Sequence, residues 1–159
     1  MKKIDIIPIQ EYIKIRKTDM GFFDKFSSNV KLTPAIALAT SMIYMMSADG
    51  EISDEELNYL ATKLYAIGDA DELIRLSAKY SKKQSLEEFQ KEANEILTKD
   101  QKLTILANLI DILLADGNAE EEEQELFFSF VNAFGISEDE IQTYIDVLSV
   151  KNDLASFVE

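Results

Sequence analysis

Two acidic Asp-Gly turns contain the residues of this chain that are best suited to chemistry. The first turn lies within residues 47–57, SADGEISDEEL, and the second begins at Ala115-Asp116-Gly117 and continues into a run of four glutamates, 120–123. Carboxylate and amide oxygens are the ligands that hard divalent cations prefer. The candidate ligands are the oxygen-bearing residues of the two turns: Asp49, Glu51, Glu55, Glu56, Asp116, Asn118, Glu122 and Glu123. They predict a divalent-cation site, with calcium as the first candidate.

The first turn matches the second half of an EF-hand calcium loop. In residues 49–56, DGEISDEE, an Asp stands at loop position 5, Gly at 6, an aliphatic residue at 8, Ser at 9 and Glu at 12. Positions 1 and 3 would be Met45 and Ser47 in the first turn, and Ile112 and Leu114 in the second. Neither turn can therefore enclose a calcium ion alone, but the two half-loops could converge on one shared acidic site.

The same residues also have a purely structural interpretation. Asp-Gly is a common tight turn, and an acidic residue in the first turn of a helix gains roughly 0.3–1 kcal/mol from the helix dipole. Ser53 and Glu56 have the spacing of a capping box, which would occupy the Glu56 carboxylate. In the second turn a helix starting from Asn118, with Glu121 as its box partner, would rotate Glu123 away from a shared site. The residues alone leave both interpretations open.

Composition excludes several classes of function. The 159 residues hold 16 Lys and Arg against 30 Asp and Glu, a net charge of −14, which argues against nucleic-acid binding because phosphate contacts need a basic face. The chain has no Cys and no His, so thiolate zinc sites and His-containing catalytic triads are excluded. No Lys or Arg adjoins either motif to hold a phosphate in a metal-assisted hydrolysis. We therefore predict that the protein is not an enzyme.

The sequence also indicates where the protein resides. Its apolar segments are interrupted well before the ~20 residues that a transmembrane helix needs. The N-terminus lacks the apolar core and small-residue cleavage site of a signal peptide. We expect a cytoplasmic protein with no transmembrane segment.

Both turns belong to a unit that occurs twice at a spacing of 67 residues. Asp49 and Gly50 correspond to Asp116 and Gly117, and the apolar residues before each turn correspond as well. A fixed offset that preserves both loop chemistry and core pattern indicates an internal duplication. The expected fold is all-α: a single compact bundle of about seven helices, built from a duplicated helix–Asp-Gly turn–helix unit.

Capping signals predict the helix boundaries. We expect helices over about 34–48, 54–67, 71–79, 86–97, 103–114, 121–134 and 138–150. Asp100 is the expected cap of the fifth of these, and Ser137 with Glu140 the expected capping box of the last. Gly68 and Gly135 are the expected C-terminal stops of the second and sixth.

The N-terminal residues differ from the rest of the chain. Residues 1–19 are rich in Ile and interrupted by Pro8, and residues 1–31 carry seven Lys or Arg and four Asp or Glu, a net charge of +3. The remainder therefore carries −17. We predict a basic, Ile-rich extension over 1–19 and one helical domain over 20–159.

The paired Ala-Asp-Gly turns, each ending an apolar helix and followed by a Glu-rich helix, resemble the tellurite-resistance TerB-like family over about residues 20–150. The segment 20–25, MGFFDK, also resembles the start of family members. The resemblance implies a compact cytoplasmic helical domain whose acidic turns bind divalent metal. It also implies association with a membrane protein partner during metal and oxidant stress, at the inner face of the membrane. Carried over by position, the ligands are Asp49, Glu56, Asp116 and Glu123.

Two function classes follow. The first is a non-enzymatic, metal-responsive binding module of the tellurite-resistance and stress-response type, in which the ion held by the paired turns is coupled to a protein partner. The alternative is a metal-independent protein–protein interaction scaffold whose acidic turns are purely structural caps.

Overall fold

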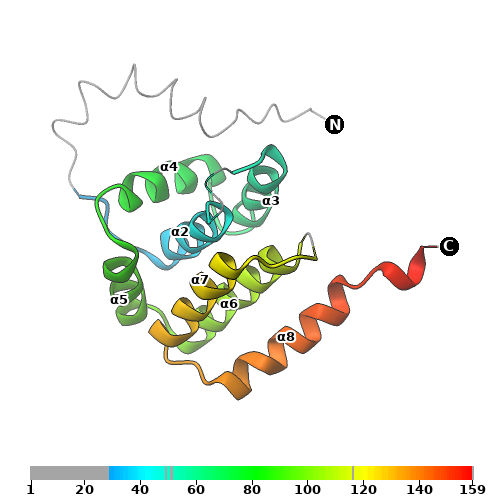
Figure 1. Cartoon of the computed structure of the whole chain (residues 1–159). Coiled ribbons are helices and arrows are strands. Elements are labelled where there is room, and N and C mark those ends of the chain that lie inside the picture. Colours follow the sequence, from blue (N-terminus) through cyan, green and yellow to red (C-terminus); the bar gives the residue numbers. More distant parts are fainter. Residues whose placement is uncertain (1–28, 49, 51, 116, 159) are drawn as a thin grey trace.

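The computed structural model describes residues 29–48, 50, 52–115 and 117–158. Within this part the chain forms seven α-helices, one short 3₁₀ helix and no strand, which confirms the expected all-α class (Figure 1). The helices are α2 (Pro34–Met46), α3 (Asp54–Leu64), α4 (Ala70–Ser81), α5 (Leu86–Ile96), α6 (Lys99–Leu114), α7 (Glu121–Ala133) and α8 (Glu138–Asn152), followed by η1 (Ala155–Phe157). The extension predicted over residues 1–19 lies outside the described residues.

Helix α2 is the centre of the fold. Its sequence, PAIALATSMIYMM, is apolar around most of its circumference, so it must be covered on all sides. It packs chiefly against α4 and α6, and also contacts α3, α5 and α7 (Figure 1). Met42 is fully buried, and burying a side chain of this size contributes about 1.5–3 kcal/mol relative to leaving it exposed.

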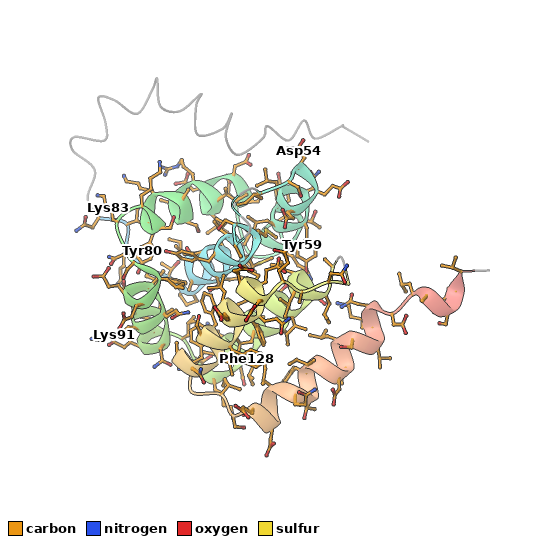
Figure 2. All side chains as sticks on the ribbon, viewed as in Figure 1. Asp54, Tyr59, Tyr80, Lys83, Lys91 and Phe128 are labelled. Carbon is orange, nitrogen blue, oxygen red and sulfur yellow. The ribbon has the colours of Figure 1, made fainter. Side chains whose placement is uncertain are left out.

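Aromatic side chains join α5 and α7 to this centre. The rings of Phe89 on α5 and Phe130 on α7 meet edge-to-face with centroids 6.2 Å apart, and Tyr44 of α2 stacks on Phe89 at 5.6 Å. Such pairs add about 0.5–1.5 kcal/mol beyond the burial of their area. Side chains fill the space between the helices, whereas Asp54 points outward from the start of α3 (Figure 2).

Three of the helices begin at the N-terminal caps that the sequence predicts. Thr33 caps α2, with its Oγ1 accepting a hydrogen bond from the backbone N–H of Ile36 at 3.3 Å. The capping boxes predicted at residues 53–56 and 85–88 are both formed, and each glutamate accepts from the N-cap backbone N–H at 2.8 Å. The sequence predicts these helix starts because each cap joins two residues that are only three positions apart.

Two predicted starts are wrong in their details. Thr98, not Asp100, caps α6: Thr98 Oγ1 accepts from Gln101 N at 3.2 Å and Gln101 Oε1 accepts from Thr98 N at 3.0 Å. This complete box starts the helix at Lys99, and Asp100 becomes a first-turn acidic residue. At α8, Ser137 does cap the helix, but the carboxylate of Glu140 lies 3.0 Å from Lys99 Nζ and does not close a box.

Of the two glycines that we expected to end helices, only one does so. Gly135, which follows the C-cap Phe134 of α7, has a φ of +67° and is the predicted stop. Gly68 is not a stop, because α3 already ends at Leu64 and Gly68 lacks a positive φ. Gly50 and Gly117 have φ values of +98° and +77°, a region in which a residue with a Cβ is strained.

The two kinds of glycine give a matched pair of variants. Gly50→Ala should lower the free energy of unfolding by about 1–2 kcal/mol, because an L-residue is disfavoured by that amount in the left-handed region. Gly68→Ala should be tolerated, since its new Cβ would lie 3.6 Å from Leu73 Cδ1, an ordinary contact. Urea denaturation of both variants measures the difference; equal losses would show that the backbone at Gly50 is not constrained.

Candidate metal centre

The backbone of the two acidic turns has the same hydrogen-bonding pattern. Gly50 N donates to Ser47 O at 2.9 Å, and Gly117 N donates to Leu114 O at 3.3 Å. The two donors are 67 residues apart in the sequence, and so are the two acceptors. Both glycines adopt a positive φ, as an Asp-Gly turn at the end of a helix requires. Two local sequences of similar chemistry therefore reverse the chain in the same way.

The helices after the turns begin at equivalent residues. At the start of α3, Glu56 Oε2 accepts from Ser53 N at 2.8 Å and from Ser53 Oγ at 3.0 Å. At the start of α7, Glu123 Oε2 accepts from Glu120 N at 2.9 Å. Glu120 thus stands where Ser53 stands in the first turn, and Glu123 corresponds to Glu56.

The alternative start of the second helix does not occur. A helix capped by Asn118 with Glu121 as its box partner would have rotated Glu123 away, but α7 begins at Glu121 with Glu120 as its N-cap. A backbone N–H accepted by the carboxylate three residues later requires no serine side chain. Glu123 therefore keeps the orientation that Glu56 has in the first turn.

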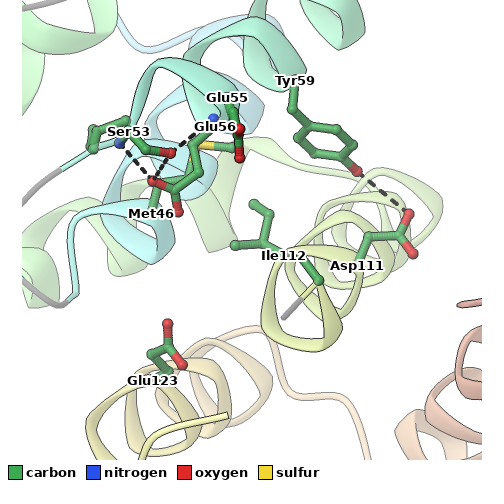
Figure 3. Close-up of a pocket in the computed structure, with 10 residues that line it drawn as sticks. Met46, Ser53, Glu55, Glu56, Tyr59, Asp111, Ile112 and Glu123 are labelled. Atoms are coloured by element: carbon green, nitrogen blue, oxygen red, sulfur yellow. Dashed lines mark hydrogen bonds between the residues drawn. The ribbon is translucent and has the colours of Figure 1, made fainter. Parts of the chain in front are cut away.

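A surface cavity of about 590 Å³ lies between the two turns. Three of the predicted ligands line it, with Glu55 and Glu56 on one side and Glu123 facing them from the other (Figure 3). The remaining lining residues are Met46, Ile52, Ser53, Tyr59, Asp111, Ile112 and Ala115. Carboxylates from two turns that are distant in sequence thus share one space, whose lining is partly polar and partly apolar.

The other predicted ligands are placed differently. Glu122 and Asn118 are exposed and do not line the cavity. Asp49, Glu51 and Asp116 lie outside the described residues. Among the residues that the structure does describe, no three Asp or Glu side chains are close enough together to hold a metal ion. A complete site would therefore need further oxygens, and the two turn aspartates are the candidates.

The cap hydrogen bonds involve only one of the two oxygens of each glutamate carboxylate that faces the cavity. Both cap hydrogen bonds are made by Oε2 of Glu56 and of Glu123. Within the described part of the chain, Oε1 of each of these glutamates makes no hydrogen bond. One oxygen of each side chain is thus fixed by the helix start while the other is available to a ligand.

The chain matches the family model of tellurite resistance protein TerB over residues 35–144. It belongs to the TerB family. The matched segment runs from α2 into α8 and includes both acidic turns, in agreement with the resemblance noted in the sequence. No curated protein and no solved structure matches the chain. In the described part of this TerB-family chain, no helix is long and apolar enough to cross a membrane.

A carboxylate that the sequence interpretation missed forms part of the cavity wall of this TerB-family domain. Asp111 accepts from Lys151 Nζ at 2.7 Å (Oδ1) and 2.8 Å (Oδ2), and from Asn152 Nδ2 at 2.9 Å. Tyr59 donates its hydroxyl to Asp111 Oδ2 over a long 3.5 Å. Asp111 thus links α3, α6 and α8. The signal that could have revealed it is its position as the only charged residue within 103–114.

The surroundings of Asp111 keep it ionised. Burial alone would raise its pKa, but the hydrogen bonds from Lys151 and Asn152 and the charges of Lys151 and Lys63 together hold the pKa below its ordinary 3.8. Burial, then the charge and hydrogen bond of Asp111, raise the pKa of Tyr59 to about 12. At neutral pH this wall therefore presents a carboxylate and a neutral phenol.

We expect Lys151→Met to raise the pKa of Asp111, because burial then opposes ionisation without the ammonium to offset it. Carboxyl-carbon NMR titration measures this directly. In the wild-type protein the lowered pKa stabilises the fold fully above 3.8, and this contribution is lost as the pH falls through the folded-state pKa. In the Lys151→Met variant, the contribution of the ionised Asp111 to the stability of the fold should be smaller. Lys99→Met, which removes the partner of Glu140 instead, should leave the pKa of Asp111 unchanged.

Proposed function

We propose that this TerB-family protein is a non-enzymatic binding module that holds a divalent cation, calcium in the first instance, between its two acidic turns. The observation that carries the proposal is that Glu56 and Glu123, 67 residues apart, line the same cavity with one carboxylate oxygen each free of cap bonds. Asp49 and Asp116, which directly precede the turn glycines, would supply the remaining carboxylates. The ion would then tie together two helix starts.

Electrostatics supports this arrangement. Carboxylates that converge on one cavity repel one another, and the chain as a whole carries a net charge of −14. A divalent cation relieves that repulsion only in the folded arrangement, so it stabilises the fold by mass action. Because both turns lack the first half of a calcium loop, we expect weak binding, with a dissociation constant of roughly 10⁻⁴ to 10⁻³ M.

The rest of the proposal follows the family to which the chain belongs. In the tellurite-resistance type of module, the bound ion would be coupled to a protein partner during stress, in the cytoplasm and at the inner face of the membrane. The absence of His and Cys from the sequence supports a binding role over a catalytic one.

A metal-independent scaffold is the second candidate, and one specific observation favours it. Glu56 and Glu123 are both used to cap α3 and α7, which is sufficient reason for a glutamate at each position. Under this alternative the cavity would bind a protein partner directly, and divalent cations would act only by screening the acidic surface.

Thermal melting with calcium distinguishes the two candidates. At about ten times the dissociation constant, a specific ion should stabilise the fold by about 1.4 kcal/mol, a rise in melting temperature of roughly 3–6 °C for a chain of this length. Asp49→Asn, Asp116→Asn and Glu123→Gln should each remove most of the rise. Glutamine can still accept the cap hydrogen bond, so the last variant separates ligation from capping.

The control for charge is Asp100→Asn, at the end of α6 farthest from the cavity, which makes the same change of charge as the turn variants. It should retain the full rise, and sodium chloride at matched ionic strength should not reproduce it. If the three motif variants retain the rise as well, calcium is only a screening ion and the scaffold is the better description.

A further inference from the structure

Helix α8 has one face that packs on the bundle and an opposite face that no other part of the described chain covers. The inward face carries Ile141, which is 2% exposed, and Tyr144, Ile145 and Leu148, which pack against the core. Residues three, four and seven positions apart lie on one side of a helix, so the bundle uses this side along most of the helix. The opposite side runs along the edge of the molecule and leads into η1 (Figure 1).

The outward side carries most of the exposed apolar side chains of the described chain. Nine large apolar side chains are exposed among the described residues, and five of them fall within residues 147–158. These five, which we call the outer stripe, are 63% to 81% exposed: Val147, Val150, Leu154, Phe157 and Val158. Such a concentration of exposed apolar side chains marks an interaction surface. The outer stripe lies wholly beyond residue 144, where the family match ends.

The outer stripe has an acidic border. Asp139, Asp146 and Asp153 follow one another at intervals of seven residues, about two helical turns, so they form a row beside it. Residues 138–159 contain six Asp or Glu and one basic residue, Lys151, a net charge of −5. Lys151 is engaged with the body of the protein, where its ammonium lies 2.7 Å from Asp111. A second copy of α8 would bring a like charge, so the occupant that fits is apolar and basic.

We propose that the outer stripe is the docking surface for the N-terminal extension of the same chain, residues 1–19. The extension has the required charge, with five Lys or Arg against three Asp or Glu, a net charge of +2. It also has the required apolar side chains: Ile4, Ile6, Ile7, Ile9, Ile13 and Ile15. The extension and the outer stripe both lie outside the matched residues 35–144. The contact needs no ion in the acidic cavity, so it is independent of the function proposed above.

The extension is long enough to reach the outer stripe. The described chain begins, in blue, on the opposite side of the bundle from the end of α8 (Figure 1). The residues before position 29 can span about 90 Å when extended, at about 3.3 Å per residue. A compact domain of about 130 residues has a radius of gyration of roughly 14 Å. The extension can therefore cross the bundle within one molecule.

Paramagnetic relaxation in the full-length protein tests the contact. The chain contains no cysteine, so Thr143→Cys, exposed on α8 one turn before Val147, can carry a single nitroxide label. We expect this label to broaden the backbone amide signals of residues 4–15. The same label at Lys91→Cys, on α5 and away from α8 (Figure 2), should leave those signals sharp. If the α8 label leaves them sharp, or if both labels broaden them equally, the proposal is refuted.

An exchange of charges tests which groups hold the extension. Arg16→Glu with Lys17→Glu should weaken the broadening by the α8 label, because the ratio of docked to free extension should fall about fivefold, as for the loss of two exposed ion pairs. Asp146→Lys with Asp153→Lys in the same protein should restore the broadening. If the second pair of substitutions does not restore it, the acidic border does not bind the extension and the proposal is refuted.

Two matched controls separate this contact from general effects of charge and apolarity. Lys82→Glu with Lys83→Glu makes the same change of net charge at the end of α4 and should leave the broadening unchanged. Val150→Ser, within the outer stripe, should weaken it, whereas Ile67→Ser, at an exposed apolar residue elsewhere, should not. An equal effect of each control and its counterpart would refute docking on the outer stripe.

A mixed sample distinguishes the extension of the same molecule from a second copy. Isotope-labelled protein without a nitroxide is mixed with unlabelled protein that carries the nitroxide on α8. Docking within one molecule should leave the signals of residues 4–15 sharp in this mixture. Broadening in the mixture would show that the outer stripe receives another copy of the chain, which overturns the proposal. The cation site is tested separately by melting with calcium, so either proposal can fail while the other stands.

Discussion

The burial of two apolar helices, α2 and α6, is the constraint on which the rest of the structure depends. They pack against each other at the centre of the bundle, and each ends in an Asp-Gly turn. The ends of both helices reach the same cavity, which is lined by Met46 of α2, Ile112 of α6 and Ala115. Two acidic segments that would repel each other in a free chain are therefore held close together by the apolar contacts behind them.

The caps after the turns give the acidic residues a defined geometry. A glutamate side chain is flexible, and ordering it normally costs conformational entropy. Here one oxygen of Glu56 and one of Glu123 is already fixed by a backbone N–H, so part of that cost is met by helix formation. Capping and ligand binding are thus compatible uses of the same carboxylate, and the presence of a cap does not decide between them.

Local features of this fold could be read from the sequence, whereas long-range ones could not. The caps of α2, α3 and α5 and the stop at Gly135 are each specified within a few residues. The predicted start of α6 is wrong although its signal is equally local: Asp100 is a good cap residue, but Thr98 and Gln101 have the spacing of a capping box, and that box forms. The pairing of Asp111 with Lys151 spans 40 residues and depends on how α8 packs on α6, so no local sequence pattern predicts it. The sequence did place Glu55, Glu56 and Glu123 among the site residues, and the cavity brings these three together.

The boundary of the family match has an evolutionary consequence. The matched segment ends at residue 144, so Asp111 lies inside it while Lys151 and Asn152 lie beyond it. The Asp111 carboxylate lies in the part that the family model matches, whereas the two groups that donate to it, the ammonium of Lys151 and the side-chain amide of Asn152, lie beyond that part. A contact of this kind, which joins a matched helix to residues outside the match, can change between related chains without any change in the helices that form the core.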